Sequence, residues 1–297
     1  MLPPIVPAGI GLLRRTEKTG PIAFNYGDFV LSCDSSHHLP KILAQLPDFG
    51  RNLADIVLAL EIDQAHIIDV GANIGDTALL LARFAPGNKV LCIEGDPQFM
   101  PYLETNISQI TGVTAVRAIL SDASGESAGN FVVRHGTAHL ELAATGDRIL
   151  MITLDDLLKN YAEFSTPDLV KIDTDGFDAA ILRGAKQVLT SARPVVFYEW
   201  HPGFYGLAGE RETDHACFLK SLGYTRFIVY TNRGEALLVT EAPGIDIWES
   251  LARFSRGRQS VDDWHYDIAA FPDEHYGAWH RLAGHYSKSG IREHLTR

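Results

Sequence analysis

Short apolar runs alternate with longer amphipathic segments along most of the sequence. The runs that predict buried strands lie at 66–70, 89–93, 113–118, 169–173 and 195–199. Between them, segments such as 76–84 and 97–109 carry apolar residues at helical spacing. Strands that alternate with helices in this way predict a mostly parallel sheet with helices on both faces.

Other segments depart from this alternation. Residues 22–33 predict a hairpin, and residues 39–60 are mainly helical in pattern. Residues 121–150 are rich in Gly, Ser, Ala and Thr and predict a β-type insertion. A second hairpin is predicted at 225–240, where it would close the sheet with an antiparallel strand.

These patterns divide the chain into three parts. Residues 1–60 form a lead-in of hairpin and helices, 61–241 form the α/β domain, and 242–297 form a helical tail rich in aromatic residues and histidine. The tail sequence DWHYD, residues 263–267, could cover an acceptor or simply pack. The expected fold class is α/β and Rossmann-like, with a mostly parallel seven-stranded sheet, an antiparallel terminal strand and helices on both faces.

The stretch HIIDVGANIGD, residues 66–76, is the strongest functional signal in the sequence. A strand ends in Gly71 and Gly75 before a helix begins, which is how α/β folds build a nucleotide pocket. Glycine lets the backbone turn tightly and approach a ligand closely. Asn73 stands where a dinucleotide-binding motif often has another glycine, and the acid Asp69 lies two residues before Gly71.

Acidic residues also follow the next two strands. Glu94 comes 23 residues after Gly71 and could accept both hydroxyls of a ribose, because a carboxylate offers two oxygens. This role suits several nucleoside cofactors and does not choose among them. Ser121 and Asp122 follow the third strand, where Asp122 could accept from an adenine amine or form an Asx-type turn.

Two later strands deliver polar residues to the same sheet edge. Asp173 could hold the amino group of a cofactor, orient an acceptor hydroxyl or bind a metal, and its alternative is a helix-capping acid. Asp175 could have a functional role or could simply form part of a turn. Glu199 and His201 follow the next strand, and His201 is a candidate general base because its ordinary pKa lies near neutral pH. The alternative for His201 is a surface histidine at a proline turn.

Composition narrows the classes of function. The chain has 26 Lys and Arg against 37 Asp and Glu, a formal net charge of −11, which argues against a nucleic-acid partner. No apolar run approaches the roughly 20 residues of a membrane span. The three cysteines form neither a disulfide framework nor a metal-binding CxxC pair. We therefore expect a cytoplasmic protein with reduced thiols.

Taken together, the motifs resemble the FkbM family of S-adenosylmethionine-dependent methyltransferases. The resemblance rests on DVGANIGDTALLLAR, CIEGDP, LSD, ITLDDLL, DLVKIDTDGFDAAILRGA and VVFYEWHP, in this order across about 66–203. The segment SHHLPKILAQLP, residues 36–47, also looks like the family. Asp175 stands where the family commonly has glutamate, which keeps the charge and shortens its reach.

The resemblance implies that residues 61–241 bind S-adenosylmethionine and that a methyl group moves to a hydroxyl of a sugar, glycan or natural-product acceptor. The residues expected to bind the cofactor are Asp69, Gly71, Asn73, Gly75, Glu94, Ser121, Asp122 and Asp173. Asp173, His201 and Glu199 are expected to be catalytic, and no metal site is expected, although Asp173, Asp175 and Glu199 could suit magnesium. A homodimer is a further option.

Two other classes of function stay open. An NAD-dependent oxidoreductase acting on a sugar or nucleotide-sugar would share the fold and Glu94, but the chain lacks the third glycine and a Tyr-x-x-x-Lys pair. A non-catalytic module that binds S-adenosylmethionine or a sugar is the other alternative, with the tail serving a partner.

Overall fold

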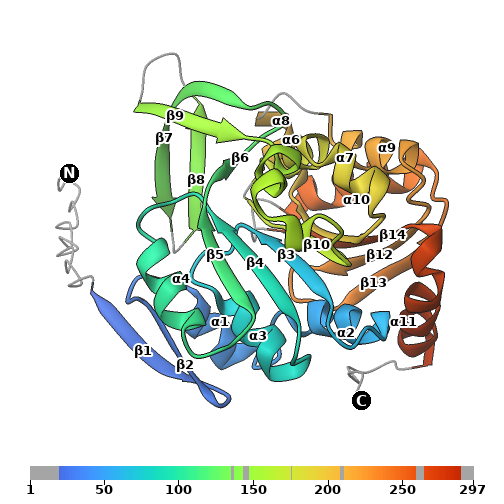
Figure 1. Ribbon diagram of the computed structural model, residues 1–297. Helices are drawn as coiled ribbons and strands as arrows, with labels where there is room; N and C mark the ends of the chain where they lie inside the picture. The colour runs from blue at the N-terminus through green and yellow to red at the C-terminus, as the bar shows by residue number, and fades with distance from the viewer. Residues whose placement is uncertain are drawn as a thin grey trace, which may run out of the picture.

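The structure is a computed structural model that describes residues 20–134, 137–142, 147–174, 176–207, 211–258 and 264–288 (Figure 1). Its strands are β1 (Pro21–Tyr26), β2 (Phe29–Asp34), β3 (His66–Val70), β4 (Lys89–Glu94), β5 (Val113–Arg117), β6 (Ile119–Leu120), β7 (Gly125–Arg134), β8 (Thr137–Leu142), β9 (Asp147–Ile152), β10 (Leu169–Ile172), β11 (Val195–Trp200), β12 (Arg226–Thr231), β13 (Ala236–Glu241) and β14 (Tyr266–Phe271).

The α-helices are α1 (Leu39–Gln45), α2 (Arg51–Leu60), α3 (Asp76–Phe84), α4 (Met100–Ile107), α5 (Leu154–Leu157), α6 (Asp178–Gly184), α7 (Lys186–Ser191), α8 (Pro202–Leu207), α9 (Asp214–Ser221), α10 (Ile245–Arg258) and α11 (Tyr276–Lys288). Short 3₁₀ helices lie at Leu158–Asn160, Ala162–Phe164 and Asp273–His275. None of these helices, in the ranges described, has the length and apolar character needed to cross a membrane.

The described residues form one main sheet of eight strands in the order β13-β12-β14-β11-β10-β3-β4-β5. The five strands from β11 to β5 are parallel. Successive crossovers through helices place the carboxyl ends of these strands along one edge. The predicted α/β class, with a mostly parallel sheet, is confirmed.

The antiparallel part of the sheet differs from the prediction. The hairpin predicted at 225–240 forms as β12 and β13, but the strand next to β11 is β14, from the tail expected to be helical. β14 runs antiparallel to both β11 and β12, and β13 adds an eighth strand at the edge. Its sequence YDIAAF contains two alanines, which are depleted in strands, so the local pattern marks it weakly. The tail is thus part of the sheet, with helices on either side of β14.

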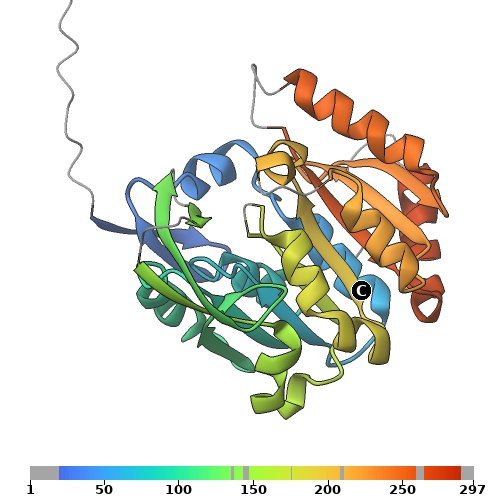
Figure 2. The same cartoon turned by 90° about the horizontal axis from the view of Figure 1, so that it is seen from above.

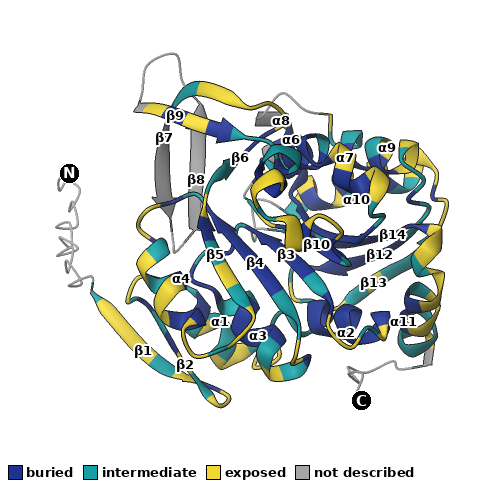
Figure 3. Cartoon of the chain, in the orientation of Figure 1, coloured by how far each residue is buried: buried dark blue, intermediate teal, exposed yellow. Residues whose placement is uncertain are grey.

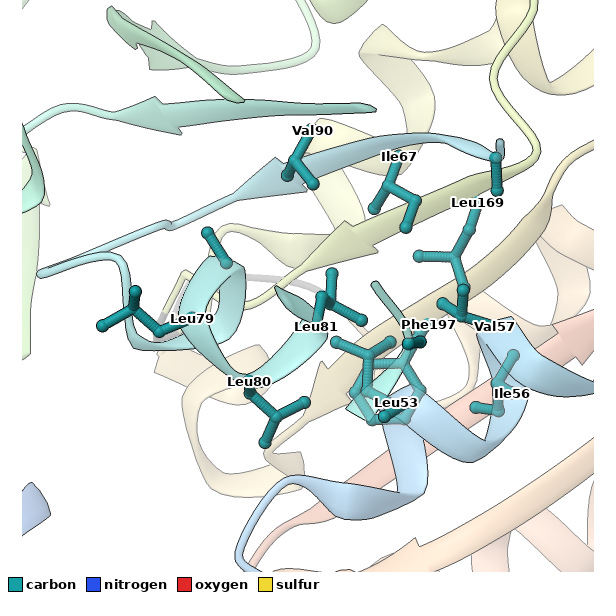
Figure 4. Packing of buried hydrophobic residues seen from close by; sticks show 14 of the residues in the cluster. Leu53, Ile56, Val57, Ile67, Leu79, Leu80, Leu81, Val90, Leu169 and Phe197 are labelled. Atoms are coloured by element: carbon teal, nitrogen blue, oxygen red, sulfur yellow. The ribbon is translucent and has the colours of Figure 1, made fainter. Parts of the chain in front are cut away.

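Residues of the inner strands of the main sheet are mostly buried (Figure 3), and period-two alternation places their side chains in turn on the two faces. In β3, Ile67 packs on one face and Ile68 on the other. Helices α2, α3, α4 and α11 cover the first face, and α5, α6, α7, α9 and α10 cover the second. Figure 4 shows side chains of α2 and α3 gathered against Ile67 and Leu169 on the first face.

Two smaller sheets flank the strand-β5 side of the molecule. The predicted hairpin at 22–33 is confirmed as β1 and β2, and the predicted insertion is a four-stranded sheet of order β6-β9-β7-β8. Figure 2 shows the hairpin and the insertion toward one end and the C-terminal elements toward the other. Helix α11 docks on the lead-in, where Arg281 donates to the carbonyl of Ala59 at 2.7 Å.

Candidate active site

The chain between β3 and α3 turns through three residues of positive φ: Gly71 at 75°, Asn73 at 47° and Gly75 at 84°. A Cβ atom at Gly71 would lie 1.8 Å from the backbone oxygen of Asp173, so this position excludes a side chain. The glycine turn predicted from the sequence is therefore present, and it lets the ends of β3 and β10 approach closely.

Glu94 ends strand β4 and holds this turn in place. Its Oε2 accepts a hydrogen bond from the backbone N–H of Asn73 at 2.8 Å, and its Oε1 accepts one from Asp96 at 2.7 Å. Burial raises the pKa of the Glu94 carboxyl, and the two N–H donors oppose that shift. Because each carboxylate oxygen has a second lone pair, Glu94 can still accept hydrogen bonds from ribose hydroxyls.

The segment SHHLP contacts the same turn. His37 Nδ1 accepts a hydrogen bond from the backbone N–H of Leu39 at 3.1 Å, so in the neutral ring the proton lies on Nε2. His37 Nε2 lies 3.2 Å from Asn73 Oδ1, to which it can then donate. The imidazole also meets the edge of Phe99, with the ring centroids 6.3 Å apart. The segment at 36–47, which resembles the family in sequence, therefore contacts the glycine turn through His37.

A cavity opens beside the glycine turn, and we name it the first cavity. Its lining includes the polar group Gly71, Asn73, Glu94, Asp173 and Thr174, and the apolar group Val70, Ile93, Phe99, Ala118, Ile119, Leu120, Phe177 and Ile181. Apolar side chains that can enclose a base, next to a carboxylate that can bind a sugar diol, suit a nucleoside. Four of the predicted cofactor residues are thereby brought together.

Ser121 and Asp122 are not brought to this cavity. Ser121 is buried, and its backbone N–H pairs with the carbonyl of Ile152 in the insertion. Asp122 Oδ2 lies 3.0 Å from the Arg183 guanidinium on helix α6. The preceding residues 118–120 line the cavity instead, because the chain there turns away to pair with β9.

Asp69 lies beneath the turn and lines neither cavity described here. Its carboxylate is fully buried and pairs with Lys171 Nζ at 2.9 Å, and the same ammonium lies 3.3 Å from Asp173 Oδ2. Burial raises the pKa of Asp69, although Lys171 opposes the rise. Burial alone would lower the pKa of Lys171, but Asp69 and Asp173 outweigh it and raise that pKa. Asp69 thus joins adjacent strands through an ion pair.

Lys171 is a residue that the sequence analysis missed. A signal was present, because Lys171 interrupts the apolar strand sequence LVKI, all four residues of which are buried. A lysine in a buried strand needs a carboxylate partner. The pattern could not show that its partners would be Asp69 on the next strand and Asp173 two residues on.

A second cavity lies next to the first and shares Asp173 with it. Its polar lining includes Asn52, Asp76, Thr77, Lys171, Asp173, Glu199, Asn232, His265 and Asp267, and its apolar lining includes Tyr26, Leu39, Leu43, Phe49, Leu53, Leu80 and Phe197. Asp173 lines both cavities, and its side chain is 51% exposed. The two predicted catalytic acids, Asp173 and Glu199, are therefore brought to one site.

The imidazole in this second cavity is His265 and not His201. His265 Nε2 lies 3.4 Å from Glu199 Oε1. His201 is 2% exposed, lines neither cavity and stacks on His265 with ring centroids 6.1 Å apart. The sequence signal for His265 was the DWHYD segment. Its position at the sheet edge depends on the pairing of β14 with β11, which the sequence analysis did not predict.

Asp267, in the same segment, was also missed as a site residue. It lies opposite Glu199 in the register of β14 with β11. Burial first, and then repulsion from Asp173, raises the pKa of Asp267 from 3.8 to about 7, while Lys171 and Asn52 oppose the rise. The site thus contains a carboxyl that changes its charge near neutral pH.

Among the described residues, no group of three His, Cys, Asp or Glu side chains is arranged to hold a metal ion. Asp175, one of the residues considered for magnesium, lies outside the described residues.

The family described as "Methyltransferase FkbM domain" matches residues 69–225. A methyltransferase FkbM structure from Methylobacillus flagellatus is similar at 15% identity and a TM-score of 0.44, covering 70% of this chain but only 44% of that chain. No curated protein matches the sequence.

Two other methyltransferase structures show similar levels of likeness. Precorrin-6y C5,15-methyltransferase from Geobacter metallireducens has 15% identity and a TM-score of 0.40, covering 75% of this chain and 86% of that one. TYW2 from M. jannaschii, in complex with AdoMet, has 13% identity and a TM-score of 0.39, covering 84% of each chain.

Proposed function

This chain belongs to the FkbM methyltransferase family, and on that premise we propose that it uses S-adenosylmethionine to methylate a hydroxyl of a small-molecule or glycan acceptor. The observation that carries the proposal is the position of Asp173, which lines both cavities. A methyl donor in the first cavity and an acceptor in the second would meet at this carboxylate.

The lining of the first cavity fits the proposed cofactor. Glu94 keeps lone pairs for the ribose hydroxyls, and Phe99 and Phe177 are among the apolar side chains available to the adenine. Thr174 Oγ1 is buried there without a hydrogen-bond partner among the described residues, and a polar cofactor tail would satisfy it. Asn73, whose backbone N–H donates to Glu94, is a further polar residue in the lining of the first cavity.

When bound, S-adenosylmethionine would supply an activated methyl group, with its sulfur as the leaving group, for transfer to the acceptor oxygen. We assign removal of the hydroxyl proton to Asp173, because it lines both cavities and is half exposed. Lys171, 3.3 Å away, holds that carboxylate in one orientation. The protein would contribute mainly this orientation and proton transfer.

Glu199 and His265 line the second cavity, where the proposal places the acceptor. The contact between them fixes the imidazole at the wall of the second cavity. His201, a candidate base in the sequence analysis, would support His265 from behind through ring stacking. We therefore expect His265→Ala to lower the rate of methyl transfer more than His201→Ala does, at equal affinity for the cofactor. An equal or greater loss in His201→Ala would return the catalytic role to His201.

The first experiment is isothermal titration of the purified protein with S-adenosylhomocysteine, with NAD(H) as the parallel ligand. We expect micromolar binding of S-adenosylhomocysteine that Glu94→Ala abolishes. Glu104→Gln, which removes an exposed acid of helix α4, is the matched control and should bind as the wild type does.

Binding of NAD(H) alone would replace this proposal with the oxidoreductase. Binding of S-adenosylhomocysteine without methyl transfer to any hydroxylated acceptor would favour a non-catalytic module. A cytoplasmic location, which the sequence analysis predicts, stays a prediction, and a homodimer stays an option.

A further inference from the structure

Acidic groups outnumber basic groups in the second cavity. Four carboxyls line it, from Asp76, Asp173, Glu199 and Asp267. Of the described residues in the lining, Lys171 is the one lysine or arginine, and it also neutralises Asp69 beneath the cavity. Burial raises the pKa of Asp76 and of Asp267, and a cation bound beside these carboxyls would favour their ionised forms. Such a lining repels anions and favours a cation.

Asn52 gives a second, independent sign of a ligand. Its side chain is 5% exposed, comes from helix α2 and lines the second cavity. The amide nitrogen is buried and makes only a weak hydrogen bond, to the Asp267 carboxyl, whose pKa it lowers. Because an amide nitrogen carries two N–H groups, the other N–H has no acceptor among the described residues. A buried N–H donor calls for an acceptor oxygen, which a ligand hydroxyl can supply.

The rest of the lining supplies apolar surface. Leu39, Leu53 and Phe197 are among the side chains that line the cavity away from the carboxyls. A ring with one apolar face and polar substituents at its edge fits a site with this division.

We propose that the second cavity takes a hydroxylated ring that carries an ammonium group, the chemistry of an amino sugar, and that it excludes phosphorylated or carboxylated acceptors. The inference rests on the proposed function and specifies its acceptor. The ammonium lies between Glu199 and Asp267, which face each other across β11 and β14. A ring hydroxyl accepts from Asn52, and another lies at Asp173.

Binding of such a cation has a consequence for protonation. Near neutral pH, Asp267 is partly protonated, and the charged groups that act on it include Asp173 and Lys171. Glu199 lies opposite Asp267 in the sheet register. His265 lies two residues before Asp267 in the sequence and also lines the second cavity. An ammonium beside Asp267 lowers its pKa and expels a proton. The enthalpy of binding at pH 7 therefore depends on the ionisation enthalpy of the buffer.

The test uses three monosaccharides that share a ring and differ in charge: D-glucosamine, D-glucose and D-glucuronate. Each is titrated into the full-length protein saturated with S-adenosylhomocysteine. We expect glucosamine to bind at least about tenfold more tightly than glucose, and glucuronate not to bind. Proton release should accompany glucosamine binding alone. Equal affinities, a preference for glucuronate, or no binding of any sugar would each overturn the proposal.

Variants separate this proposal from the cofactor assignment. Glu199→Gln and Asp267→Asn should each reduce the preference for glucosamine over glucose toward one, with unchanged affinity for S-adenosylhomocysteine. Glu104→Gln removes one negative charge away from both cavities and should leave the preference intact. If the wild type does not bind S-adenosylhomocysteine, the proposed function itself is refuted. A preference retained in both cavity variants would show that these carboxyls do not select the cation.

Discussion

Replacing Asp267 by asparagine should change how the stability of this protein depends on pH. The substitution keeps the size of the side chain and removes its ability to ionise. In the folded protein, burial and the charge of Asp173 raise the pKa of Asp267 from 3.8 to about 7. The folded state therefore binds more protons than the unfolded chain between these two values.

The sign follows from that difference. The raised pKa stabilises the fold fully, relative to the ionised state, below pH 3.8, and this contribution is lost as the pH rises through about 7. A shift of about three pKa units corresponds to about 4 kcal/mol of lost stability above pH 7. At pH 5 only about 2 kcal/mol has been lost. Relative to the wild type, Asp267→Asn should thus gain about 2–3 kcal/mol between pH 5 and pH 8.5.

The assay is urea denaturation of the wild type and the variant at pH 5, 7 and 8.5, followed by far-ultraviolet circular dichroism. Taking the difference between the two proteins at each pH cancels the titration of groups that both share. Glu104→Gln, which removes an exposed acid, should give a difference that does not change with pH. A constant difference for Asp267→Asn would refute the reasoning, because it would mean that this carboxyl has the same pKa in both states.

Three further substitutions test the supports of the site. Gly71→Ala should cost about 3 kcal/mol or more and abolish S-adenosylhomocysteine binding, because its Cβ would meet the Asp173 carbonyl; wild-type binding would contradict this. Lys171→Met should lower the free energy of unfolding by about 3–5 kcal/mol, since it leaves Asp69 buried without its partner, and adding Asp69→Asn should recover part of the loss. Thr153→Ala should cost about 1 kcal/mol in thermal or urea unfolding, because the Thr153 hydroxyl caps α5; an unchanged midpoint would show that the cap is dispensable.

Local signals in the sequence were sufficient for most of the elements. The parallel strands, both hairpins and the β-type insertion form where the alternation of apolar residues predicts them. The glycine turn and Glu94 were also predictable, because each depends on residues close to the end of one strand. Gly71 is needed where φ is positive, and Glu94 bonds the turn directly beside it.

Other features of the site needed the tertiary structure, because they depend on contacts between distant parts of the chain. β14 pairs with β11 across about 70 residues, and that pairing brings His265 and Asp267 to Glu199. Asp122 likewise lies outside the first cavity because it pairs with Arg183, which is 61 residues away in the sequence.

The sequence by itself determined where most strands, turns and helices form, with β14 as the exception, since backbone conformation and side-chain alternation are set over a few neighbouring residues. Only the tertiary structure decided which strand ends meet. It placed Asp173 at both cavities and set Lys171 between Asp69 and Asp173. Burial beside like charges then gave Asp267 a pKa that no local pattern encodes, because that environment is assembled from β14, β10 and α2, which are far apart in the sequence.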